Sequence, residues 1–529
     1  MAIIGPKEKE VNGTMKSDKM MSLDDAMMLT GFGVYNIFHM LLGGIILMGV
    51  ITQSLALGYV LPAAQCDLGL TASLQGLLAA TPFMAIILTS YVWGWLGDTR
   101  GRRPVMLYTM LVSVVFSVFT SFAPDTASFA VLQFLSAVFT SGSTAVVYTY
   151  IGEFNNLRHR DKMVTFGSSF VGIGTVVLPG ISWLILPLDF ATYIGFLDIY
   201  YRPWRLLVVA CALPFFFSFI CLCFMPESPK FLYTAGRVDE ALDVVKKIYS
   251  VNKRMPADSF PVTALTYEGP IKTTEVQKSS AFMTVLKSMR DQTVPLFRMP
   301  LLPWTILLCF VQFGCFASTN GFYVWFPTIL NSLSSHEGGD TRICDVLEAG
   351  RAPVENGTVV ECIDTISTET FLRSIYIGLV FCSMYIIVGF LVDYIGKKTI
   401  LVTILTVTGA CGIGAHLVTS QQSGVILFAI FQMCGACIGL MNAVAVELFP
   451  TKYRAMSVCL GMMMGRTGSM VGSNLIGFLL NSNCGVAFYL FGGIVTVNGL
   501  VCLTLPSRKK MNKEPTTEEP TQCQTHEPA

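Results

Sequence analysis

The sequence predicts an all-α membrane protein with twelve transmembrane helices in two six-helix bundles and both chain ends in the cytoplasm. Three observations predict this fold: few charged residues, apolar stretches of membrane-spanning length, and two motifs that recur in the second half of the chain. Of the 529 residues, 53% are hydrophobic and 13% are charged, about half the charged share of a soluble domain. The apolar stretches reach about 20 residues, which is enough to cross a hydrocarbon core of about 30 Å.

Twelve apolar spans can be placed along the chain, and Gly and Pro are frequent inside them. Membrane helices tolerate both residues, because neighbouring helices and ordered water satisfy the backbone groups that they free. The spans cover about residues 34–61, 74–97, 105–122, 128–150, 164–187, 204–225, 301–329, 371–395, 399–418, 424–446, 455–480 and 484–505.

Lys and Arg cluster in alternate connections between these spans. The short loops after spans one, three, nine and eleven contain neither residue. Basic residues follow the even-numbered spans, for example Arg102 and Arg103 after span two and Arg160 after span four. By the positive-inside rule, this alternation places the basic connections and both termini in the cytoplasm. It also supports the number of spans, because one missed helix would break the pattern.

The spans and the long connections divide the chain into five parts. These are a cytoplasmic tail (1–31), a first six-helix bundle (32–225), a cytoplasmic linker with short helices (226–300), a second bundle (301–505) with an exofacial loop (332–370), and a polar, disordered tail (506–529). Most of the sixteen cysteines lie in apolar spans, where they act as small packing residues. In the exofacial loop, Asn356-Gly-Thr is a glycosylation motif, and Cys344 and Cys362 have room to form a disulfide.

Two motifs recur at nearly the same distance along the chain. Asp98, in Gly94-Trp-Leu-Gly-Asp-Thr-Arg-Gly-Arg-Arg, corresponds to Asp393, in Gly389-Phe-Leu-Val-Asp-Tyr-Ile-Gly-Lys-Lys (393 − 98 = 295). Glu153, followed by Arg158 and Arg160, corresponds to Glu447, followed by Lys452 and Arg454 (447 − 153 = 294). Two unrelated motifs at one offset indicate a duplicated six-helix unit with both copies in the same orientation. Such parallel repeats place a substrate site near the midplane, between the halves.

The charged residues of these motifs predict a gate on the cytoplasmic side. Asp98 can accept hydrogen bonds from helix N-termini or from nearby cations, and Glu153 and Glu447 can reach an Arg or Lys one or two turns onward. Such pairs can lock the two halves in one state and break in the other. The alternative is that these are ordinary interfacial charges that place helix ends; the duplication favours the gate. The predicted gating residues are Asp98, Arg102, Arg103, Glu153, Arg160, Asp393, Lys397, Glu447 and Arg454.

One ionisable residue, Arg466, lies clearly at membrane depth, about twelve residues into span eleven. Such residues are costly and mark function by default, and the guanidinium fork suits a carboxylate, sulfate or phosphate. We therefore expect an anion-binding Arg in the central cavity. The alternative is an Arg that bonds neighbouring carbonyls or reaches toward the cytoplasm, with a packing role.

Other polar and aromatic residues in the spans are weaker candidates for substrate contact: Asn320, Asn442, Gln53, Tyr323 and Trp183. Amides within a bilayer must find partners, so Asn320 and Asn442 rank first. For each residue alone, helix packing or an interfacial belt is the alternative, and Trp183 is the most belt-like. No Asp or Glu lies mid-span, which disfavours proton-coupled symport and favours exchange or facilitated diffusion.

No enzyme site is visible in the sequence, which has no metal-ligand cluster, no Gly-rich phosphate loop with its Lys, and no nucleophile arrangement. We expect no cofactor and no metal. The basic clusters flank helices and orient them, so nucleic acid is not an expected partner. The expected partners are a small organic ion and the lipid bilayer, and the protein is expected to be monomeric.

With these motifs the chain resembles the major facilitator superfamily, within it the branch of synaptic vesicle glycoprotein 2 and the organic ion transporters. The resemblance covers about residues 20–505. Ser22-Leu-Asp-Asp-Ala resembles the start of that branch, and Pro226-Glu-Ser-Pro-Lys resembles a sugar-porter-like motif. Tyr323-Val-Trp-Phe-Pro and Val446-Glu-Leu-Phe-Pro match helices seven and ten. The resemblance implies a secondary transporter in a plasma or vesicle membrane, and organic anion transporters have a basic residue at the position of Arg466.

The chain also departs from the vesicle glycoproteins. Their two acidic residues on the first helix correspond to Val50 and Gln53 here, and their Trp and Asp on the tenth helix correspond to Ile438 and Asn442. The mirror of Pro226-Glu227 in the second half is Pro506-Ser507, without the acid. A substrate or ligand shared with the glycoproteins is therefore not expected.

Two functions follow from this evidence. The first is a secondary transporter that moves a small organic ion, with an anion favoured, by alternating access; the intact duplicated motifs favour it. The second is a non-transporting vesicle or cell-surface glycoprotein of the same fold, acting as a receptor or sorting partner through the 332–370 loop. The altered first helix favours the second.

Overall fold

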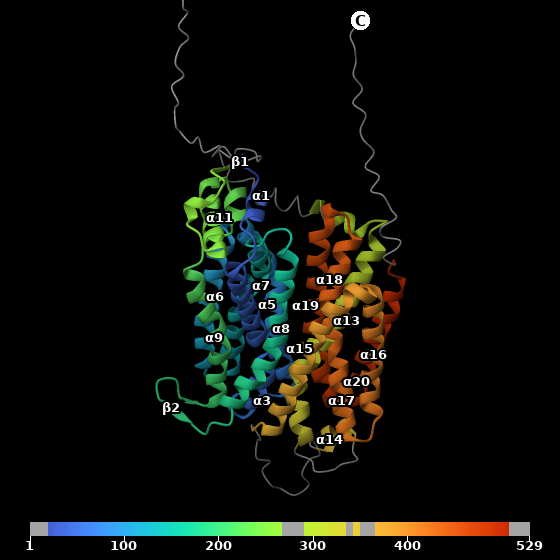
Figure 1. Cartoon of the computed structure of the whole chain (residues 1–529). Helices are drawn as coiled ribbons and strands as arrows, with labels where there is room; N and C mark the ends of the chain where they lie inside the picture. The colour runs from blue at the N-terminus through green and yellow to red at the C-terminus, as the bar shows by residue number, and fades with distance from the viewer. Residues whose placement is uncertain (1–19, 267–289, 292, 335–341, 350–364, 507–529) are drawn as a thin grey trace, which may run out of the picture.

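The computed structural model describes residues 20–266, 290–291, 293–334, 342–349 and 365–506. These residues form two helical halves that lie side by side (Figure 1). The only strands in the described ranges form two short two-stranded sheets, one of β1 (Met20–Met21) with β4 (Ala264–Leu265) and one of β2 (Thr192–Ile194) with β3 (Ile199–Tyr201). The predicted all-α fold is confirmed.

All six predicted spans of the first half are helices, and the first continues past a break into a short helix. They are α2 (Val34–Leu55) with α3 (Leu57–Ala63), α5 (Ala72–Arg100), α6 (Arg102–Ser121), α7 (Thr126–Glu153), α8 (Arg160–Ile185) and α9 (Pro203–Cys223). Short helices lie around them: α1 (Leu23–Leu29), α4 (Gln65–Leu68), α10 (Pro229–Thr234), α11 (Val238–Lys253) and η1 (Ala257–Ser259).

The second half repeats this arrangement. Its helices are η2 (Val294–Phe297), α13 (Leu302–Ser334), α14 (Ile343–Ala349), α15 (Thr368–Ile395), α16 (Lys397–Leu417), α17 (Gln421–Gln432), η3 (Met433–Ala436), α18 (Cys437–Leu448), α19 (Thr451–Ser482), α20 (Cys484–Val501) and η4 (Cys502–Thr504). The tenth predicted span is one rod made of α17, η3 and α18, which are continuous along the chain.

Eleven helical segments among the described residues are long and apolar enough to cross a membrane. The predicted eleventh span, α19, is not one of them, although it is 32 residues long. Its sequence contains Gly, Ser, Asn and Arg466 in place of large apolar residues. Since α19 packs against both α13 and α5, its polar content fits a helix that faces other helices more than lipid.

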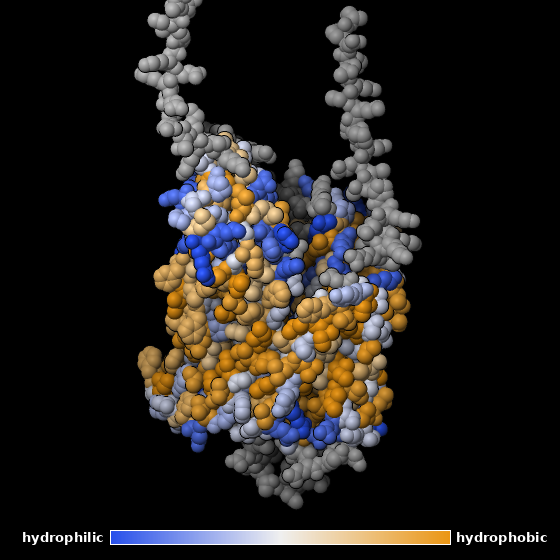
Figure 2. Space-filling model, in the orientation of Figure 1, coloured by the Kyte–Doolittle hydropathy of each residue, from blue (hydrophilic) through white to orange (hydrophobic). Residues whose placement is uncertain are grey.

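The two ends of the molecule carry different additions (Figure 1). At one end, called the linker end, α1 and α11 lie over the first half, and α10 packs against α11. At the other, called the hairpin end, the β2–β3 hairpin and α14 project. The positive-inside rule predicts that the linker end lies in the cytoplasm. Between the two ends the surface is mainly apolar, with polar residues gathered at the ends (Figure 2), as a membrane-spanning bundle requires.

Glycine makes the same tight turn in each half, between the second and third spans. Gly101 joins α5 to α6 with φ +108°, and Gly396 joins α15 to α16 with φ +90°. Side chains other than hydrogen strongly disfavour these backbone angles. A Cβ at Gly101 would also lie 2.2 Å from Oε2 of Glu227. The repeated glycine is therefore a requirement of the turn, which brings the charged residues on either side of it together.

The two halves touch each other where α5 packs against α19, and also in the middle of the helices and toward the hairpin end. Gly58 of α3 lies against the backbone of Val324 in α13, and Gly378 of α15 lies against the Thr175 carbonyl of α8. The Tyr323 hydroxyl also donates to the Thr175 carbonyl oxygen at 3.3 Å. These contacts hold the halves together on the hairpin side, and Figure 2 shows a notch between them at the linker end.

Cys344 of α14 forms a disulfide with Cys484 at the start of α20. The predicted pairing of Cys344 with Cys362 is therefore wrong, and Cys362 lies outside the described residues. The bond joins positions 140 residues apart, because folding brings the loop helix α14 against the twelfth span. Cys66, in the loop after the first span, is disulfide-bonded as well.

Replacing Cys484 with Ala is expected to lower the free energy of unfolding by about 2–4 kcal/mol, because the disulfide closes a long loop in the unfolded chain. Cys344→Ala should cost a similar amount, and the double variant should cost no more than either single variant. Thermal unfolding of the purified protein measures all three. Cys411→Ala, which removes a free thiol on α16, is the control. Additive losses in the double variant would contradict the shared bond.

Candidate substrate site and charge networks

Arg466 lies in the middle of α19, on the face that packs against α13. Its guanidinium lies over the Phe316 ring of α13, 5.5 Å from the ring centroid, within cation–π range. It also interacts electrostatically with Tyr148 of α7, in the other half. Among the residues that the structure describes, no carboxylate, carbonyl or hydroxyl accepts a hydrogen bond from Arg466. Its charge is half-buried between the halves, and no described residue supplies a counter-charge.

A second Arg within a helix, Arg205 of α9, shows what a purely structural arginine looks like in this protein. Its exposed fraction is 3%, and its Nη1 donates to the carbonyl oxygens of Ser121 at 3.0 Å and Ala123 at 2.7 Å. A cation that binds the last carbonyls of a helix stabilises that helix end. Arg205 therefore caps α6. Arg466 has no such carbonyl partners, so the alternative in which it bonds neighbouring carbonyls does not hold for the described residues.

Polar contacts lie one turn from Arg466 on each side. Toward the hairpin end, Nδ2 of Asn320 in α13 donates to Oγ of Ser469 at 2.9 Å. Toward the linker end, Oδ1 of Asn442 in α18 accepts from Nε2 of Gln312 at 2.7 Å. The structure thus brings the first-ranked candidates, Asn320 and Asn442, to the same face as Arg466. Phe316 could not be recognised from the sequence, because a ring contact with a cation depends on which helices are neighbours.

The other predicted substrate residues lie elsewhere. The Gln53 side chain is buried in the first half, where its Oε1 accepts from Ser113 Oγ at 2.9 Å and Thr140 Oγ1 at 2.8 Å. Tyr323 reaches across to α8 in the contact described above. Trp183 is 39% exposed near the hairpin end of α8, as a residue of an interfacial belt would be. None of the three has a described contact with Arg466.

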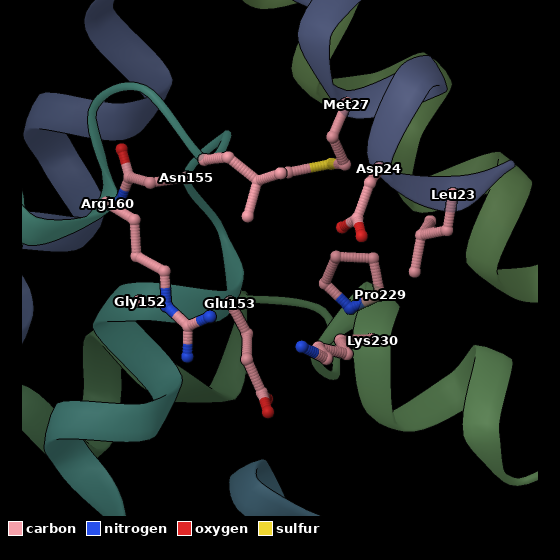
Figure 3. A pocket seen from close by; sticks show the side chains of 10 residues that line it. Leu23, Asp24, Met27, Gly152, Glu153, Asn155, Arg160, Pro229 and Lys230 are labelled. Atoms are coloured by element: carbon pink, nitrogen blue, oxygen red, sulfur yellow. The ribbon is translucent and has the colours of Figure 1, made fainter. Parts of the chain in front are cut away.

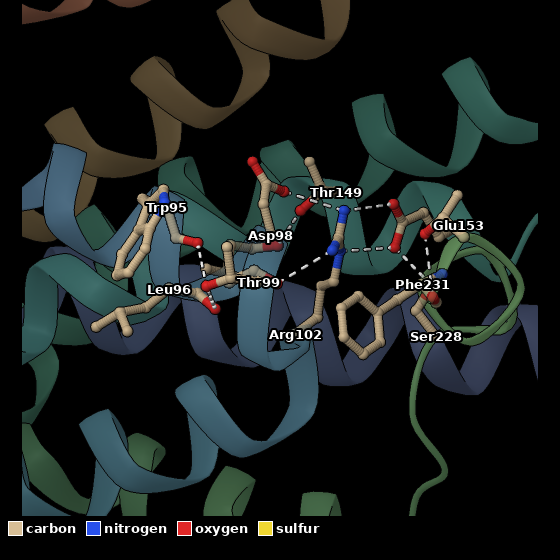
Figure 4. Close-up of polar contacts among 12 residues, drawn as sticks. Trp95, Leu96, Asp98, Thr99, Arg102, Thr149, Glu153, Ser228 and Phe231 are labelled. Carbon is tan, nitrogen blue, oxygen red and sulfur yellow. Dashed lines mark hydrogen bonds and ion pairs between the residues drawn. The ribbon is translucent and has the colours of Figure 1, made fainter. Parts of the chain in front are cut away.

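A charge network is built around Arg102 at the linker end of the first half (Figure 4). Its guanidinium pairs with Glu153 of α7, with Nε 3.1 Å from Oε2, and with Asp98 of α5, with Nη2 3.1 Å from Oδ1. The Arg102 and Glu153 side chains are 13% and 6% exposed, whereas Asp98 is 73% exposed. The Ser228 hydroxyl donates to Oε2 of Glu153 at 2.6 Å. The Arg102–Glu153 pair is therefore the buried centre of the network.

Glu227 caps the N-terminus of α6 from outside the helix, since the residue that precedes α6 provides no side-chain cap. Its carboxylate accepts from the backbone N–H groups of Arg102 and Arg103, each at 3.2 Å, and from that of Ser228 at 2.7 Å. Burial raises the pKa of the Glu227 carboxyl, and these N–H bonds oppose that rise. The sequence showed the motif around Glu227 but not its target, which lies 124 to 125 residues away.

The second half repeats this network with fewer members. Lys397 pairs with Glu447 as Arg102 pairs with Glu153. Lys398 donates to the carbonyl oxygens of Leu503 and Leu505 at the end of the last span, as Arg103 donates to those of Leu222 and Cys223 at the end of the sixth. The expected pairing of each Glu with basic residues farther along its own motif does not occur in these contacts. Instead, the two motifs of one half pair with each other.

Some predicted residues have no described role in these networks. Arg160 and Arg454 form no hydrogen bond or ion pair through their side chains with the described residues. The Asp393 side chain and the glycosylation site at Asn356 lie outside the described part of the structure. Every described ion pair of the gating residues lies within one half, so none of them joins the two halves in this state.

The fold and the paired networks can be compared with known proteins. The family model of the Major Facilitator Superfamily matches residues 40–341 and 370–527. The chain belongs to the major facilitator superfamily. It is a multi-pass membrane protein of a superfamily of transporters, not of enzymes, as the sequence predicted.

Curated relatives of this major facilitator protein include synaptic vesicle glycoprotein 2B from Mus musculus, 27% identical over 307 residues, which cover 56% of this chain and 45% of that protein. Synaptic vesicle glycoprotein 2A from Rattus norvegicus is 28% identical over 305 residues, or 55% of this chain and 41% of that protein. These matches confirm the predicted similarity to that branch. They span less than half the length of the relatives.

Solved structures of the superfamily support the fold. The xylose transporter XylE from E. coli, in an inward-open conformation, superposes with a TM-score of 0.63 at 13% identity, and the match covers 89% of this chain and 97% of that chain. A D-xylose-proton symporter superposes with a TM-score of 0.59 at 12% identity, over 90% of this chain and 99% of that chain. At these identities the likeness extends to the fold alone.

Proposed function

We propose that the protein is a secondary transporter that moves a small organic anion by alternating access, with Arg466 as the residue that binds the anion. The proposal rests on the Arg466 guanidinium, which lies in mid-helix and has no hydrogen-bond acceptor among the described residues. Burying a charge without a counter-charge costs several kcal/mol. A bound carboxylate, sulfate or phosphate would supply the missing partner. The solved relatives named as xylose transporters carry a neutral sugar, which has no need of such a charge.

The residues around Arg466 support recognition of an amphipathic anion. Phe316 offers an aromatic face from the second half, and Tyr148 of the first half is close enough to interact electrostatically with Arg466. Asn320 and Asn442 supply amides one turn away in either direction along the site. A small organic anion with an apolar body fits this mixture, since aromatic walls hold the body and a few polar groups fix its orientation.

The contacts between the halves support alternating access. Several of them lie in the middle and toward the hairpin end, whereas the charge networks at the linker end stay within each half. With the linker end in the cytoplasm, as the basic residues predict, parting of the halves at that end would open the site inward. When the gate closes, the linker ends of the helices meet. Their positions are held by the network residues Asp98, Arg102, Glu153, Lys397 and Glu447.

The first glycine of each repeated motif supports the same movement. A Cβ at Gly94 or at Gly389 would meet no atom within 4 Å. The present state therefore does not need a small residue at either position. Small residues at helix interfaces allow close approach of backbones, and closure of the linker end would bring these glycines against the opposite half.

Gly94→Leu is expected to abolish uptake while leaving the thermal stability of the purified protein within about 0.5 kcal/mol, the range of surface substitutions away from special features. The added side chain has space in this state and blocks the closed one. Gly493→Leu is the control, because a Cβ at Gly493, on the outer helix α20, also meets nothing within 4 Å. Normal uptake by Gly94→Leu would contradict closure at this point.

The function itself is tested with substrate panels. Vesicles or cells that contain the protein should accumulate labelled organic anions, and not organic cations or neutral sugars of similar size. The same anions should raise the thermal stability of the purified protein, because they bind the folded state. If no solute of any class accumulates or stabilises, transport is contradicted. A non-transporting receptor of the same fold would then be the function to examine.

A further inference from the structure

The β2–β3 hairpin carries an exposed aromatic surface that the proposed transport site does not use. Tyr193 of β2 and Tyr200 of β3 are Cα partners, so their side chains point to the same face of the hairpin. Their ring centroids lie 5.3 Å apart, and the two residues are 55% and 53% exposed. Phe196, in the turn between the strands, is 96% exposed. We call these three residues the aromatic face.

The opposite face of the hairpin packs against the bundle. Ile199, which alternates with the aromatic face along β3, is 5% exposed. The Tyr201 ring lies 5.3 Å from the ring of Phe122 at the end of α6. The base of the hairpin is tied down as well, because Nη1 of Arg202 lies 2.8 Å from Oδ1 of Asp67. These contacts hold the hairpin in one orientation, with its aromatic face turned away from the protein.

The position of the hairpin indicates what the aromatic face meets. The hairpin projects sideways from the first half (Figure 1), and it carries apolar residues next to the apolar band of the bundle (Figure 2). The end of α8, which leads into the hairpin, exposes Trp183 and Leu184 by 39% and 73%, as a lipid-facing helix does. Aromatic side chains at the edge of an apolar band are typical of the membrane interface. The aromatic face therefore lies where the side of the bundle meets lipid.

Charge also limits the kind of partner that the hairpin can attract. From residue 163 to residue 201 the chain contains no Lys or Arg, and its two acidic residues there, Asp189 and Asp198, are exposed. The linker end of the same half is different, because charged side chains such as Arg160 and Lys230 gather around a pocket there (Figure 3). Without a cation, the hairpin has no attraction for phosphate groups or for an acidic protein. Its binding energy has to come from apolar contact.

We propose that the β2–β3 hairpin is a membrane anchor that places its aromatic face in the lipid interface at the hairpin end. Phe196 enters the boundary between headgroups and acyl chains, and the Tyr193–Tyr200 pair lies beside it. Tyr suits this position, because its ring is apolar and its hydroxyl needs a polar partner; the Tyr193 hydroxyl donates to Asp198 at 2.9 Å. The partner is a zwitterionic lipid surface, since the hairpin offers no cation to an anionic one. The anchor holds the first bundle at a fixed depth in that leaflet.

The test places a tryptophan at the tip of the hairpin. Phe196→Trp is made in the full-length protein, which is then reconstituted into vesicles of phosphatidylcholine with or without bromine on the acyl chains. Bromine quenches indole emission by contact, and subtracting the wild-type signal isolates the added residue from the six native tryptophans. We expect brominated lipid to quench at least about half of the added emission, because an interfacial indole lies against the upper acyl chains. Since Phe196 is 96% exposed, the change leaves folding intact.

Two matched charge insertions test whether the aromatic face makes the contact. In the Phe196→Trp protein, Tyr200→Asp should lower the quenching severalfold, because it puts a charge on the face that meets lipid. Thr192→Asp, an equal change at an exposed residue on the other face of the same hairpin, should leave the quenching nearly unchanged. Val251→Trp, on α11 at the linker end and 41% exposed, is the control for a tryptophan in water and should not be quenched.

The outcomes separate lipid from the other possible surroundings of the hairpin. High salt should leave the quenching unchanged, because salt screens contacts between charges and not apolar contact. Red-shifted emission without quenching would place the hairpin in water and overturn the anchor. Blue-shifted emission without quenching would show that protein, such as a second copy of this chain, covers the aromatic face, and would overturn lipid as its partner. Equal quenching with Tyr200→Asp and Thr192→Asp would overturn the aromatic face as the contact. Stronger quenching in brominated phosphatidylglycerol would overturn the zwitterionic surface.

Discussion

Arg466→Ala is expected to reduce uptake of the transported anion by about 100-fold or more. Removing one partner of a buried charged contact costs about 2–5 kcal/mol, and each 1.4 kcal/mol is a factor of ten in binding. Arg466→Lys keeps the charge but loses the planar fork, so it should retain part of the activity. Uptake at substrate concentrations below the KM, with surface expression matched between variants, measures the effect.

Arg466→Ala should also leave the stability of the substrate-free protein unchanged or raise it. In that state the guanidinium is half-buried without a counter-charge, so its removal takes away a desolvation cost rather than a stabilising contact. Arg373→Ala, which removes a partly exposed arginine paired with Glu369 on α15, is the control for uptake. A stable Arg466→Ala protein that transports normally would contradict anion binding at this residue. A large loss of thermal stability would instead assign Arg466 a packing role.

Arg102→Ala is expected to cause the largest loss of stability of any single charge removal in the networks. It leaves the carboxylate of Glu153, 6% exposed, with only the Ser228 hydroxyl as its described partner. An uncompensated buried charge of this kind costs about 3–5 kcal/mol. Thermal unfolding in detergent measures it, and the double variant Arg102→Ala/Glu153→Gln should recover part of the loss, because the stranded charge is gone.

The internal repeat supplies a matched control for Arg102. Lys397→Ala removes the equivalent cation in the second half, but its pair with Glu447 is more exposed, at 27% and 45%. Exposed ion pairs contribute about 0–1 kcal/mol, so this variant should lose little stability. Equal losses for Arg102→Ala and Lys397→Ala would contradict burial as the source of the difference between the halves.

The sequence predicted the membrane fold, because span length and alternation of basic loops follow from the bilayer itself. Each of the twelve predicted spans corresponds to a helix or a continuous helical rod with ends within a few residues. The motif from Gly94 to Arg103 recurs from Gly389 to Lys398. This repeat also indicated residues that form the charge networks. Both signals are local or periodic, so they can be recognised without knowing which helices are neighbours.

The partners within the site could not be predicted in the same way. Glu153 has basic residues close by in its own sequence, yet it pairs with Arg102, because the turn at Gly101 aims that side chain at the end of α7. Cys362 is near Cys344 in sequence, yet Cys344 bonds to Cys484. The lack of an acceptor for Arg466 depends on every helix around it. Each of these facts requires the three-dimensional packing of segments distant in the chain.

The bonds of Arg103 and Lys398 have a mechanical consequence. Each one ties the beginning of the third span to the end of the sixth span in its own bundle, so each bundle is closed into a ring at the linker end. A ring fastened in this way resists shear between its own members. The movement of a transport cycle therefore occurs at the interface between two rigid bundles. Spectroscopic distances measured within one bundle should stay constant, while distances between the bundles should change.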